Sequence, residues 1–259
     1  QTYTLNAAGI AAINALPPGA TLTDQFPYTL TDGDGDSDPA LLTITLEGTD
    51  DGVEITNLTS KLNGGDAVVD EDDLPAGSDP APKDSLTTTG DFNISAPDGV
   101  ASLTVGGQPV VTNGVFVGPV VIDSPLGVLT ITAYNPATGL VSYSYTLQTN
   151  ADVSGANTFE DFAVSLTDTD GDNTSSTLSI QIVDDAPTAN DDGFTIYEGD
   201  ADNAISFDVD LNDVPGADGT DTRVFTTLNG TYGTLTLNPD GTQTYTLNAA
   251  GIAAINALP

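Results

Sequence analysis

The sequence predicts an all-β protein built from tandem β-sandwich domains, with one short crossover helix at about residues 7–16. The first observation is a series of short runs rich in Val, Ile, Leu and Thr, separated by Gly, Asn, Asp and Pro. The second is a hydrophobic content of 38%, which distinguishes the chain from a disordered acidic segment. The third is that the first 17 residues, Gln1–Pro17, return unchanged as Gln243–Pro259. An identity of this length indicates a repeating array.

The predicted helix lies inside the duplicated segment. Asn6 can cap its N-terminus, and Ile10 and Ile13 fall on one helical face. The prolines Pro17 and Pro18 end it, because proline cannot continue a helix. We expect this helix to cross over one end of a sandwich.

The predicted strands follow from alternation of apolar and polar residues. The clearest of them are Ala40–Leu46, Gly127–Ala133, Val141–Gln148, Phe162–Leu166, Thr177–Val183 and Thr234–Leu237. The turn Asn238-Pro239-Asp240-Gly241 joins the last of these to Gln243–Leu247, which predicts a hairpin.

Two acidic, proline-containing stretches mark the expected domain boundaries, one within residues 47–73 and one within residues 183–192. Residues 70–185 are expected to form one complete sandwich, preceded by a linker at residues 59–69. Residues 1–58 then form the C-terminal half of a preceding sandwich, and residues 186–259 form the N-terminal half of the next one. We therefore expect the chain to be a stretch of a longer string with a repeat of 242 residues.

The charge balance limits the classes of partner. The chain has 38 acidic residues against three basic ones, a formal charge of −35. Such a surface repels nucleic acid and anionic membranes, because phosphate contacts depend on Lys and Arg. No apolar run is long enough to insert this segment into a membrane. Almost all the acids are aspartate, which suits tight turns and oxygen cages around hard cations such as Ca²⁺.

The residue types present argue against an enzyme. Cysteine, histidine, methionine and tryptophan are all absent. Thiol nucleophiles, serine–histidine pairs and zinc sites of cysteine and histidine are therefore excluded. Paired carboxylates could also hydrolyse glycosides, but nothing in the sequence marks the cleft that this reaction needs.

Clustered aspartates are the candidate metal ligands. Asp168, Asp170 and Asp172 alternate along the chain, so their carboxylates can converge on one cation. Asp32, Asp34 and Asp36 have the same spacing. Neither set belongs to an EF-hand, because the twelfth loop position is Ser179 in one and Thr43 in the other. Solubilising charge is the alternative interpretation of these clusters. Isolated Asp-Gly pairs, such as Asp98-Gly99 and Asp240-Gly241, are predicted to be ordinary turns.

The order of strands in a sandwich predicts which clusters meet. Each aspartate-rich turn precedes a final strand, so it should lie beside the linker that enters the domain. Asp168, Asp170 and Asp172 are thus expected near Asp70, Glu71, Asp50 and Asp51. Asp32, Asp34 and Asp36 are expected, within the array, near Asp184, Asp185, Asn190, Asp191 and Asp192. A third acidic stretch could complete this cage, with Asp208, Asp210 and Asp213 as its ligands.

These motifs resemble two known kinds of repeat. Gly233–Leu247 together with residues 14–35 resembles the VCBS or bacterial cadherin-like repeat. Residues 66–185 are similar to Ig-like repeats of giant RTX-type, type I-secreted bacterial adhesins, through Asp70–Pro75 and through Leu166–Asp172 followed by Val183–Pro187. The resemblance implies Ig or cadherin-like sandwiches outside the cell, with calcium between domains. Cadherin linkers also use a strand glutamate, a part that Glu198 or Glu71 could play.

The leading hypothesis is therefore a structural, calcium-rigidified extender repeat of a bacterial cell-surface adhesin or extracellular fibre, acting in adhesion and biofilm formation. Its expected partners are neighbouring copies of the same repeat, with lateral fibre contacts or surface glycans as further possibilities. Two alternatives remain open: a sandwich that binds a glycan or another partner, and a subunit of a self-assembling filament.

Overall fold

The computed structural model of the chain describes residues 2–79, 84–151, 158–219 and 222–258. Its contacts divide the chain into two compact units. Unit 1 comprises Gln1–Val69, Ser85–Thr149 and Asn157–Val183, and unit 2 comprises Asp70–Asp84, Asn150–Ala156 and Asp184–Pro259. The predicted all-β sandwich class is confirmed. No helix in the described part of the chain is both long and apolar enough to cross a membrane.

Unit 1 opens with helix α1 (Ala7–Asn14) and an antiparallel hairpin of β1 (Thr21–Thr31) and β2 (Ser37–Glu47). The Asn6 side chain caps α1 by accepting a hydrogen bond from the Gly9 amide at 2.8 Å, as predicted. The helix ends at Asn14, two residues before the expected end. Leu16 precedes a proline, and a residue in that position is disfavoured in helical conformation.

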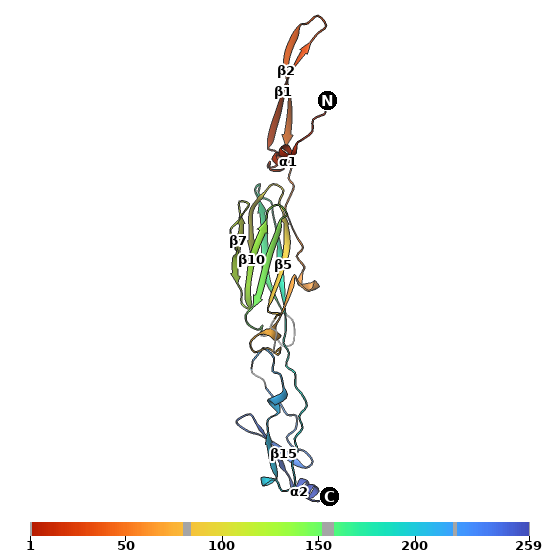
Figure 1. Cartoon of the computed structure of the whole chain (residues 1–259), viewed down its shortest axis with the longest axis vertical. Coiled ribbons are helices and arrows are strands. Elements are labelled where there is room, and N and C mark those ends of the chain that lie inside the picture. Colours follow the sequence, from red (N-terminus) through yellow and green to blue (C-terminus); the bar gives the residue numbers. More distant parts are fainter. Residues whose placement is uncertain (1, 80–83, 152–157, 220–221, 259) are drawn as a thin grey trace. The chain divides into compact units, whose positions relative to one another are not determined.

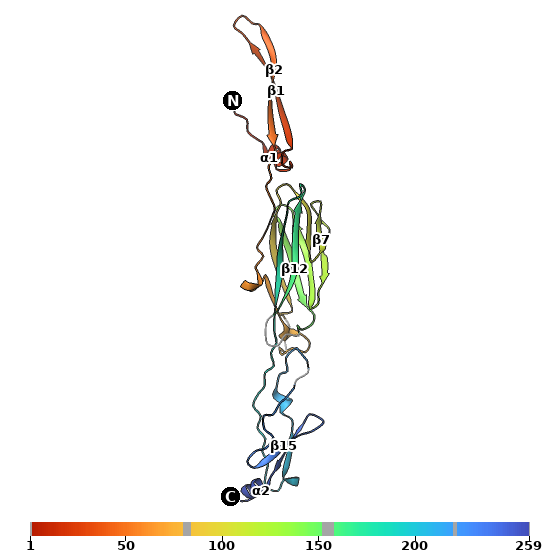
Figure 2. The same cartoon turned by 180° about the vertical axis from the view of Figure 1, so that it is seen from behind.

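The sandwich of unit 1 has two sheets, and Figures 1 and 2 show its two faces, with β5 and β10 toward the viewer in the first and β12 in the second. One sheet has the strand order β3-β5-β11-β10-β9 and the other β4-β13-β12-β6-β7-β8. The bounds are β3 Glu54–Thr56, β4 Ala67–Asp70, β5 Thr87–Ser95, β6 Val100–Val105, β7 Gln108–Thr112, β8 Val115–Phe116, β9 Val120–Asp123, β10 Gly127–Asn135, β11 Leu140–Leu147, β12 Thr158–Asp168 and β13 Asn173–Val183.

Strict alternation builds the core of this sandwich. Along β11 every second residue is buried, from Val141 to Leu147, and β12 shows the same period. The inward side chains of the two sheets meet in a fully buried set that includes Phe92, Leu103, Leu129, Ile131, Tyr145, Leu166, Leu178 and Ile180. This is the packing expected of two antiparallel sheets that each bury one face.

One polar network crosses that core. Glu160 on β12 is only 8% exposed. Its carboxylate accepts hydrogen bonds from the Tyr145 hydroxyl on β11 at 2.6 Å, from the Ser124 hydroxyl at 2.6 Å and from the Leu126 amide at 3.0 Å. Burial is the main cause that raises the pKa of Tyr145 far above its ordinary value, and the hydrogen bond to Glu160 is the second cause. The phenol therefore stays a donor to the carboxylate.

Unit 2 contains a three-stranded sheet in the order β14 (Ala204–Phe207), β16 (Gln243–Leu247), β15 (Gly233–Leu237), followed by helix α2 (Ala249–Ile255). The predicted hairpin of β15 and β16 is confirmed, with Leu235 opposite Tyr245. The described residues also form four short 3-10 helices: η1 Lys61–Asn63, η2 Glu71–Asp73, η3 Ala201–Asn203 and η4 Val209–Asn212.

The boundary expected at residue 58 differs from the pairing in the structure. β3 lies before that residue, yet it pairs with β5 of the sandwich, with Ile55 opposite Ile94. β4 begins inside the expected linker and lies beside β13. Both strands are short and follow acidic residues, so their sequences carry little alternation to mark them. The other expected domain limits remain predictions.

Candidate metal centres

Three groups of acidic side chains have carboxylate oxygens within 4.8 Å of one another among the described residues. The hairpin-tip cluster consists of Asp32, Asp34 and Asp36. The sandwich cluster consists of Asp98, Asp168 and Asp170. The Glu71 cluster consists of Glu71, Asp184 and Asp218. The first two lie in unit 1 and the third lies in unit 2.

The sandwich cluster is built on the turn between β12 and β13. Asp168, the last residue of β12, is 2% exposed. One of its oxygens accepts hydrogen bonds from the amides of Gly171 at 3.0 Å and Asp172 at 2.8 Å, and this fixes the turn. Its other oxygen, Oδ2, is buried without a hydrogen-bond partner. The turn thus leaves one carboxylate oxygen without an amide or hydroxyl donor, close to the carboxyl of Asp170.

Asp98 faces the same place from the loop between β5 and β6. It is 5% exposed, and neither of its carboxylate oxygens has a hydrogen-bond partner. The loop is fastened to the turn by the Thr169 amide, which donates to the Gly99 carbonyl at 3.0 Å, and by the Thr169 hydroxyl, which donates to the Asp98 carbonyl. Two backbones therefore bring two buried carboxylates together.

In the sandwich cluster, burial and neighbouring negative charges disfavour the ionised form of the carboxyls. Burial, and next the charge of Asp51, raise the pKa of Asp98, and the Asp51 amide partly offsets this. A hydrogen bond shared with Asp168 raises the pKa of Asp170. A hydrogen bond shared with Asp50, helped by some burial and by neighbouring charges, raises the pKa of Asp172 to about 6. A proton relieves the charge repulsion at each of these carboxyls, and a bound cation would relieve it as well.

The hairpin-tip cluster repeats this turn without its surroundings. Asp32 accepts hydrogen bonds from the amides of Gly35 at 3.0 Å and Asp36 at 2.9 Å, and all three aspartates are exposed. A hydrogen bond with the Asp34 side chain, together with these amides, lowers the pKa of Asp32. Water solvates these carboxylates, so a cation here has less to compensate.

The Glu71 cluster surrounds the most deeply buried carboxylate of the three. Glu71 is 0% exposed and lies in η2. Its Oε1 accepts a hydrogen bond from the Ala151 amide at 2.6 Å, whereas Oε2 has no partner of hydrogen-bond geometry. Burial is the main cause that raises the pKa of Glu71, and the charges of Asp218 and Asp184 add to it.

Neighbouring contacts hold the Glu71 cluster in shape. The Ser78 amide and hydroxyl donate to Asp185 at 2.8 and 2.6 Å, and the Asn150 side chain donates to Asp218 at 2.8 Å. Gly216, at φ 80°, lies against the Asp185 carbonyl, where an added Cβ would come within 2.3 Å. Only glycine fits there, so the approach of this loop to Asp185 is a built feature.

The remaining predicted ligands occupy three kinds of position. Asp50 and Asp51 are exposed beside the sandwich cluster, as expected. Asp70 caps η2 by accepting from the Asp72 amide at 3.1 Å. Asn190, Asp191 and Asp213 hydrogen-bond around η4, Asp208 caps it, and Asp210 pairs with Arg223. In the described residues, neither Asp192 nor Glu198 belongs to any of the three clusters.

The observed groupings differ from the expected ones in two respects. Glu71 lies with Asp184 and Asp218 rather than in the group expected for Asp168, because the Ala151 amide and the η2 turn hold it there. Asp98 and Asp218 each belong to a cluster that sequence reasoning did not assign. Asp98-Gly99 is a turn, as predicted, with Gly99 at φ 97°, yet its carboxylate is buried among other acids. No local signal marks either residue, because the tertiary fold supplies the neighbours.

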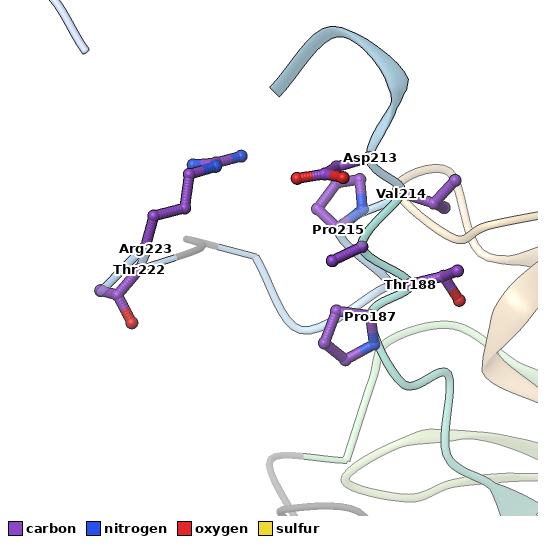
Figure 3. A pocket seen from close by; sticks show the side chains of 8 residues that line it. Pro187, Thr188, Asp213, Val214, Pro215, Thr222 and Arg223 are labelled. Carbon is purple, nitrogen blue, oxygen red and sulfur yellow. The ribbon is translucent and has the colours of Figure 1, made fainter. Parts of the chain in front are cut away.

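The structure also has a proline-lined pocket of about 390 Å³ in unit 2, shown in Figure 3. Arg223 and Thr222 lie across it from Asp213, Val214 and Pro215. Its charged groups already have partners, since Asp213 accepts from the Asn190 amide at 2.8 Å and Arg223 pairs with Asp210. The pocket therefore serves the local packing of this loop.

The clusters have the chemistry of a hard-cation site. Their converging oxygens belong to carboxylates, which are ligands that Ca²⁺ and Mg²⁺ take. The test of fit is the set of buried oxygens without partners on Asp98, Asp168 and Glu71. A buried charge without a partner is costly, and a divalent cation would compensate several at once. The residues of the sandwich and Glu71 clusters thus fit such an ion.

Comparison with known proteins places part of the chain. Residues 184–255 match the family model described as a bacterial Ig domain, and this range includes the β14–β16–β15 sheet and α2. A search of curated proteins finds no match. A structure of mouse clustered PcdhgC3 EC1-3 is similar over 92% of this chain and 69% of that chain, with 12% sequence identity and a TM-score of 0.32. The C-terminal part of this all-β chain is thus similar to bacterial Ig domains.

Proposed function

We propose that the chain is a structural extender repeat of a bacterial cell-surface adhesin or extracellular fibre, and that Ca²⁺ bound at its acidic clusters stiffens it. The observation that carries the proposal is a pair of buried carboxylates within a group of like charges: both oxygens of Asp98 and the Oδ2 of Asp168 lack a hydrogen-bond partner. A calcium ion supplies the missing partner for both.

The energetic argument compares three states of the sandwich cluster. With all its carboxylates ionised, the cluster holds like charges at close range in a partly buried place, which is destabilising. Protonation relieves the repulsion and is favoured at Asp98 and Asp170, whose pKa values are raised, but Asp172 in the same turn has a pKa of about 6 and is mostly ionised at neutral pH. Calcium accepts six to eight oxygens and stabilises the ionised cluster at neutral pH. The cluster is therefore expected to be filled under those conditions.

The Glu71 cluster extends the argument to unit 2. Glu71 and Asp184 belong to the acidic stretches on either side of the sandwich in the sequence, and the structure brings both together with Asp218. A cation at this place would tie three separate stretches of chain to one point. That restricts the freedom of segments that would otherwise repel one another, which is what an extender needs.

The calcium levels of the two compartments support an extracellular role. Extracellular modules bind calcium at roughly 10⁻⁴ to 10⁻³ M, a range that outside fluids reach and the cytosol does not. Metal-linked folding would then keep the chain loose until export and order it afterwards. The resemblance to RTX-type adhesins suggests type I secretion and a role in adhesion and biofilms, with neighbouring repeats as the partners.

The test is calcium titration of the purified chain by calorimetry, with thermal unfolding in millimolar Ca²⁺ and in chelator. We expect saturable binding and a higher unfolding temperature with calcium, both weakened by Asp98→Asn. Asp240→Asn is the matched control, since Asp240 binds only its own turn through Thr242. An unfolding temperature and a hydrodynamic radius that are the same with and without calcium would exclude the proposal.

A further inference from the structure

The duplicated segment adopts two different structures in one chain. Its C-terminal copy forms β16, the central strand of a sheet, followed by α2. Its N-terminal copy forms the matching helix α1, with the same asparagine cap, but residues 2–5 form no strand. The sequences are identical, so the difference lies in the neighbours. In the C-terminal copy β14 and β15 flank the strand, and the N-terminal copy has no strand on either side.

The N-terminal copy nevertheless shows how this segment meets the β1–β2 hairpin. The Tyr3 ring packs edge-on against Phe26 with ring centroids 6.1 Å apart, and the Tyr3 hydroxyl donates to Asp24 at 2.6 Å. A cavity of about 470 Å³ lies beside this ring, lined by Thr2, Tyr3, Phe26, Leu42 and Ile44. One side of the repeated tyrosine therefore faces an apolar space on the hairpin.

In the C-terminal copy, the corresponding tyrosine faces a second apolar cavity. Tyr245, which corresponds to Tyr3, lines an apolar cavity of about 280 Å³ with Phe194, Ile196, Ile205 and Phe207. Phe194 and Phe207 stack there with ring centroids 4.1 Å apart. Phe194 is nevertheless 46% exposed, so this apolar cluster is open to solvent.

Both sheets present one apolar face and one polar face. On the hairpin, Phe26 pairs with Leu42 and Asp24 with Ile44, so the even-numbered residues share a face that also includes Leu22 and Leu46. In unit 2, Tyr245 pairs with Ile205 and with Leu235, while the alternate positions are Thr, Ser or Ala. An antiparallel sheet with one apolar face requires something to cover it.

We propose that the β14–β16–β15 sheet of one copy and the β1–β2 hairpin of a second copy are the two halves of a single sandwich. The repeated segment is the shared element: its tyrosine contacts the aromatic cluster of one half and Phe26 of the other. Tyr245 of one copy then takes the place that Tyr3 holds on the hairpin of the next, with its hydroxyl on Asp24. The cavity beside Tyr3 and the cavity beside Tyr245 then join into a single core that surrounds this ring.

The occupant is a second copy because the contacts are already present in this chain. Residues 2–16 lie on the hairpin, and residues 244–258 have the same sequence and continue the β14–β16–β15 sheet. Exchange of one for the other keeps the contacts of the tyrosine with Phe26 and Asp24, and the gain is burial of the two apolar faces. A hairpin alone is marginally stable in water, so covering it also stabilises β1 and β2.

The inference rests on the tandem arrangement proposed above, but not on calcium, because the residues that carry it lie outside the acidic clusters. The test is sedimentation equilibrium of the chain over a range of concentrations, in millimolar Ca²⁺ and in chelator. We expect concentration-dependent head-to-tail association. Association in chelator together with an unchanged unfolding temperature would support this inference while excluding the calcium proposal. Monomers at every concentration would overturn the inference even if calcium binds.

Paired variants make the geometry falsifiable. Phe26→Asp places a charge in the proposed core from the hairpin side, and Ile205→Asp does so from the sheet side; each alone should weaken association at least about 100-fold. A mixture of the two variants retains one intact junction and should form heterodimers. Self-association of either variant alone would overturn the head-to-tail arrangement.

The repeated tyrosine provides a matched pair. Tyr3→Ser weakens the segment that competes for the hairpin, so it should strengthen association. Tyr245→Ser removes the incoming ring and should weaken it by about tenfold or more. Equal effects from these two substitutions in identical sequences would overturn the proposal. Circular dichroism of Phe26→Asp is the folding control, since Phe26 is 44% exposed and its change should leave the sandwich of unit 1 intact.

Discussion

The hairpin-tip and sandwich clusters have nearly the same sequence and the same turn, yet their carboxylates are in different environments. Thr31–Asp36 and Thr167–Asp172 share the pattern Thr-Asp-x-Asp-Gly-Asp. In both turns the first aspartate amide donates to the last aspartate carbonyl, at 2.9 Å in one and 3.0 Å in the other, and the glycines have φ of 106° and 109°. The motif therefore determines the turn.

What differs is the surroundings. The loop that carries Asp98 covers one turn and buries Asp168 to 2% exposure, whereas none of the described residues buries the other turn, whose aspartates are exposed. The pKa of Asp32 is lowered by its hydrogen bonds, and those of Asp98, Asp170 and Asp172 are raised. The comparison teaches that this motif makes a candidate metal site only where the fold adds a buried carboxylate. Four experiments can test this difference between the two turns.

Calcium should produce the largest effect, and it should act on the sandwich. At a calcium concentration 100 times the dissociation constant, one site adds about 2.7 kcal/mol of stability. For a domain of this size that corresponds to a rise of roughly 5–10 °C in unfolding temperature. Differential scanning calorimetry should show the rise, and a triple change of Asp32, Asp34 and Asp36 to Asn should preserve most of it. If the triple variant loses the whole effect, the comparison is wrong.

Asp98→Asn and Asp34→Asn should separate the two turns directly. Asp98→Asn removes a buried charge, so we expect about tenfold weaker calcium binding or more, and a more stable calcium-free protein. Asp34→Asn lies on the surface and should change the free energy of unfolding by no more than about 0.5 kcal/mol. Titration calorimetry and urea unfolding measure both quantities. Equal calcium affinities for the two variants would contradict the assignment.

Substitution of Gly35 or Gly171 should strain the two turns equally but should affect calcium binding at only one of them. Gly35→Ala and Gly171→Ala each force a side chain into a left-handed conformation, at a cost of about 1–2 kcal/mol, although nothing lies within 4 Å of the added Cβ. Both turns should therefore be locally strained by about the same amount. Only Gly171→Ala should also weaken calcium binding, because its turn supports the buried cluster. Hydrogen exchange of the two turns, together with calorimetry, can show this.

The pH dependence should be the smallest effect, because solvent screens most of these carboxyls. The pKa of Asp172 is raised from 3.8 to about 6 in the folded chain without calcium, so the folded state holds the proton more tightly than the unfolded state. This stability is complete below pH 3.8 and is lost as pH rises through 6. Asp32, whose pKa is lowered, contributes in the opposite direction, with stability lost as pH falls through its folded pKa.

Chelator-treated protein can be unfolded with urea at pH 4 to 8 to test this. Asp172→Asn should remove the loss of stability that occurs between pH 4 and 6. Added calcium should reverse this pH trend in the unsubstituted chain, so that its stability rises with pH. A profile of Asp172→Asn that is identical to that of the unsubstituted chain would show that the carboxyl of Asp172 is not responsible.

Sequence reasoning reached the fold further than it reached the site. Alternation located β10, β11 and β13: β11 buries every second residue along its whole length, and β10 and β13 bury one face over part of theirs. It could not locate β3, whose three residues are too few to show a period. Spacing found the Asp168 turn, since it depends on residues within one loop. It missed Asp98 and Asp218, which reach their clusters through loops that only the tertiary structure brings near.

The Glu160 network has a mechanical consequence for a chain without cysteine. Apolar contact between two sheets is non-directional, so on its own it resists separation better than sideways slippage. Hydrogen bonds have preferred angles, and those from Tyr145, Ser124 and Leu126 to one carboxylate on the opposite sheet are lost if the layers slide. Under a pulling force, this buried acid should hold the two layers in register, a task that a disulfide performs in many immunoglobulin sandwiches.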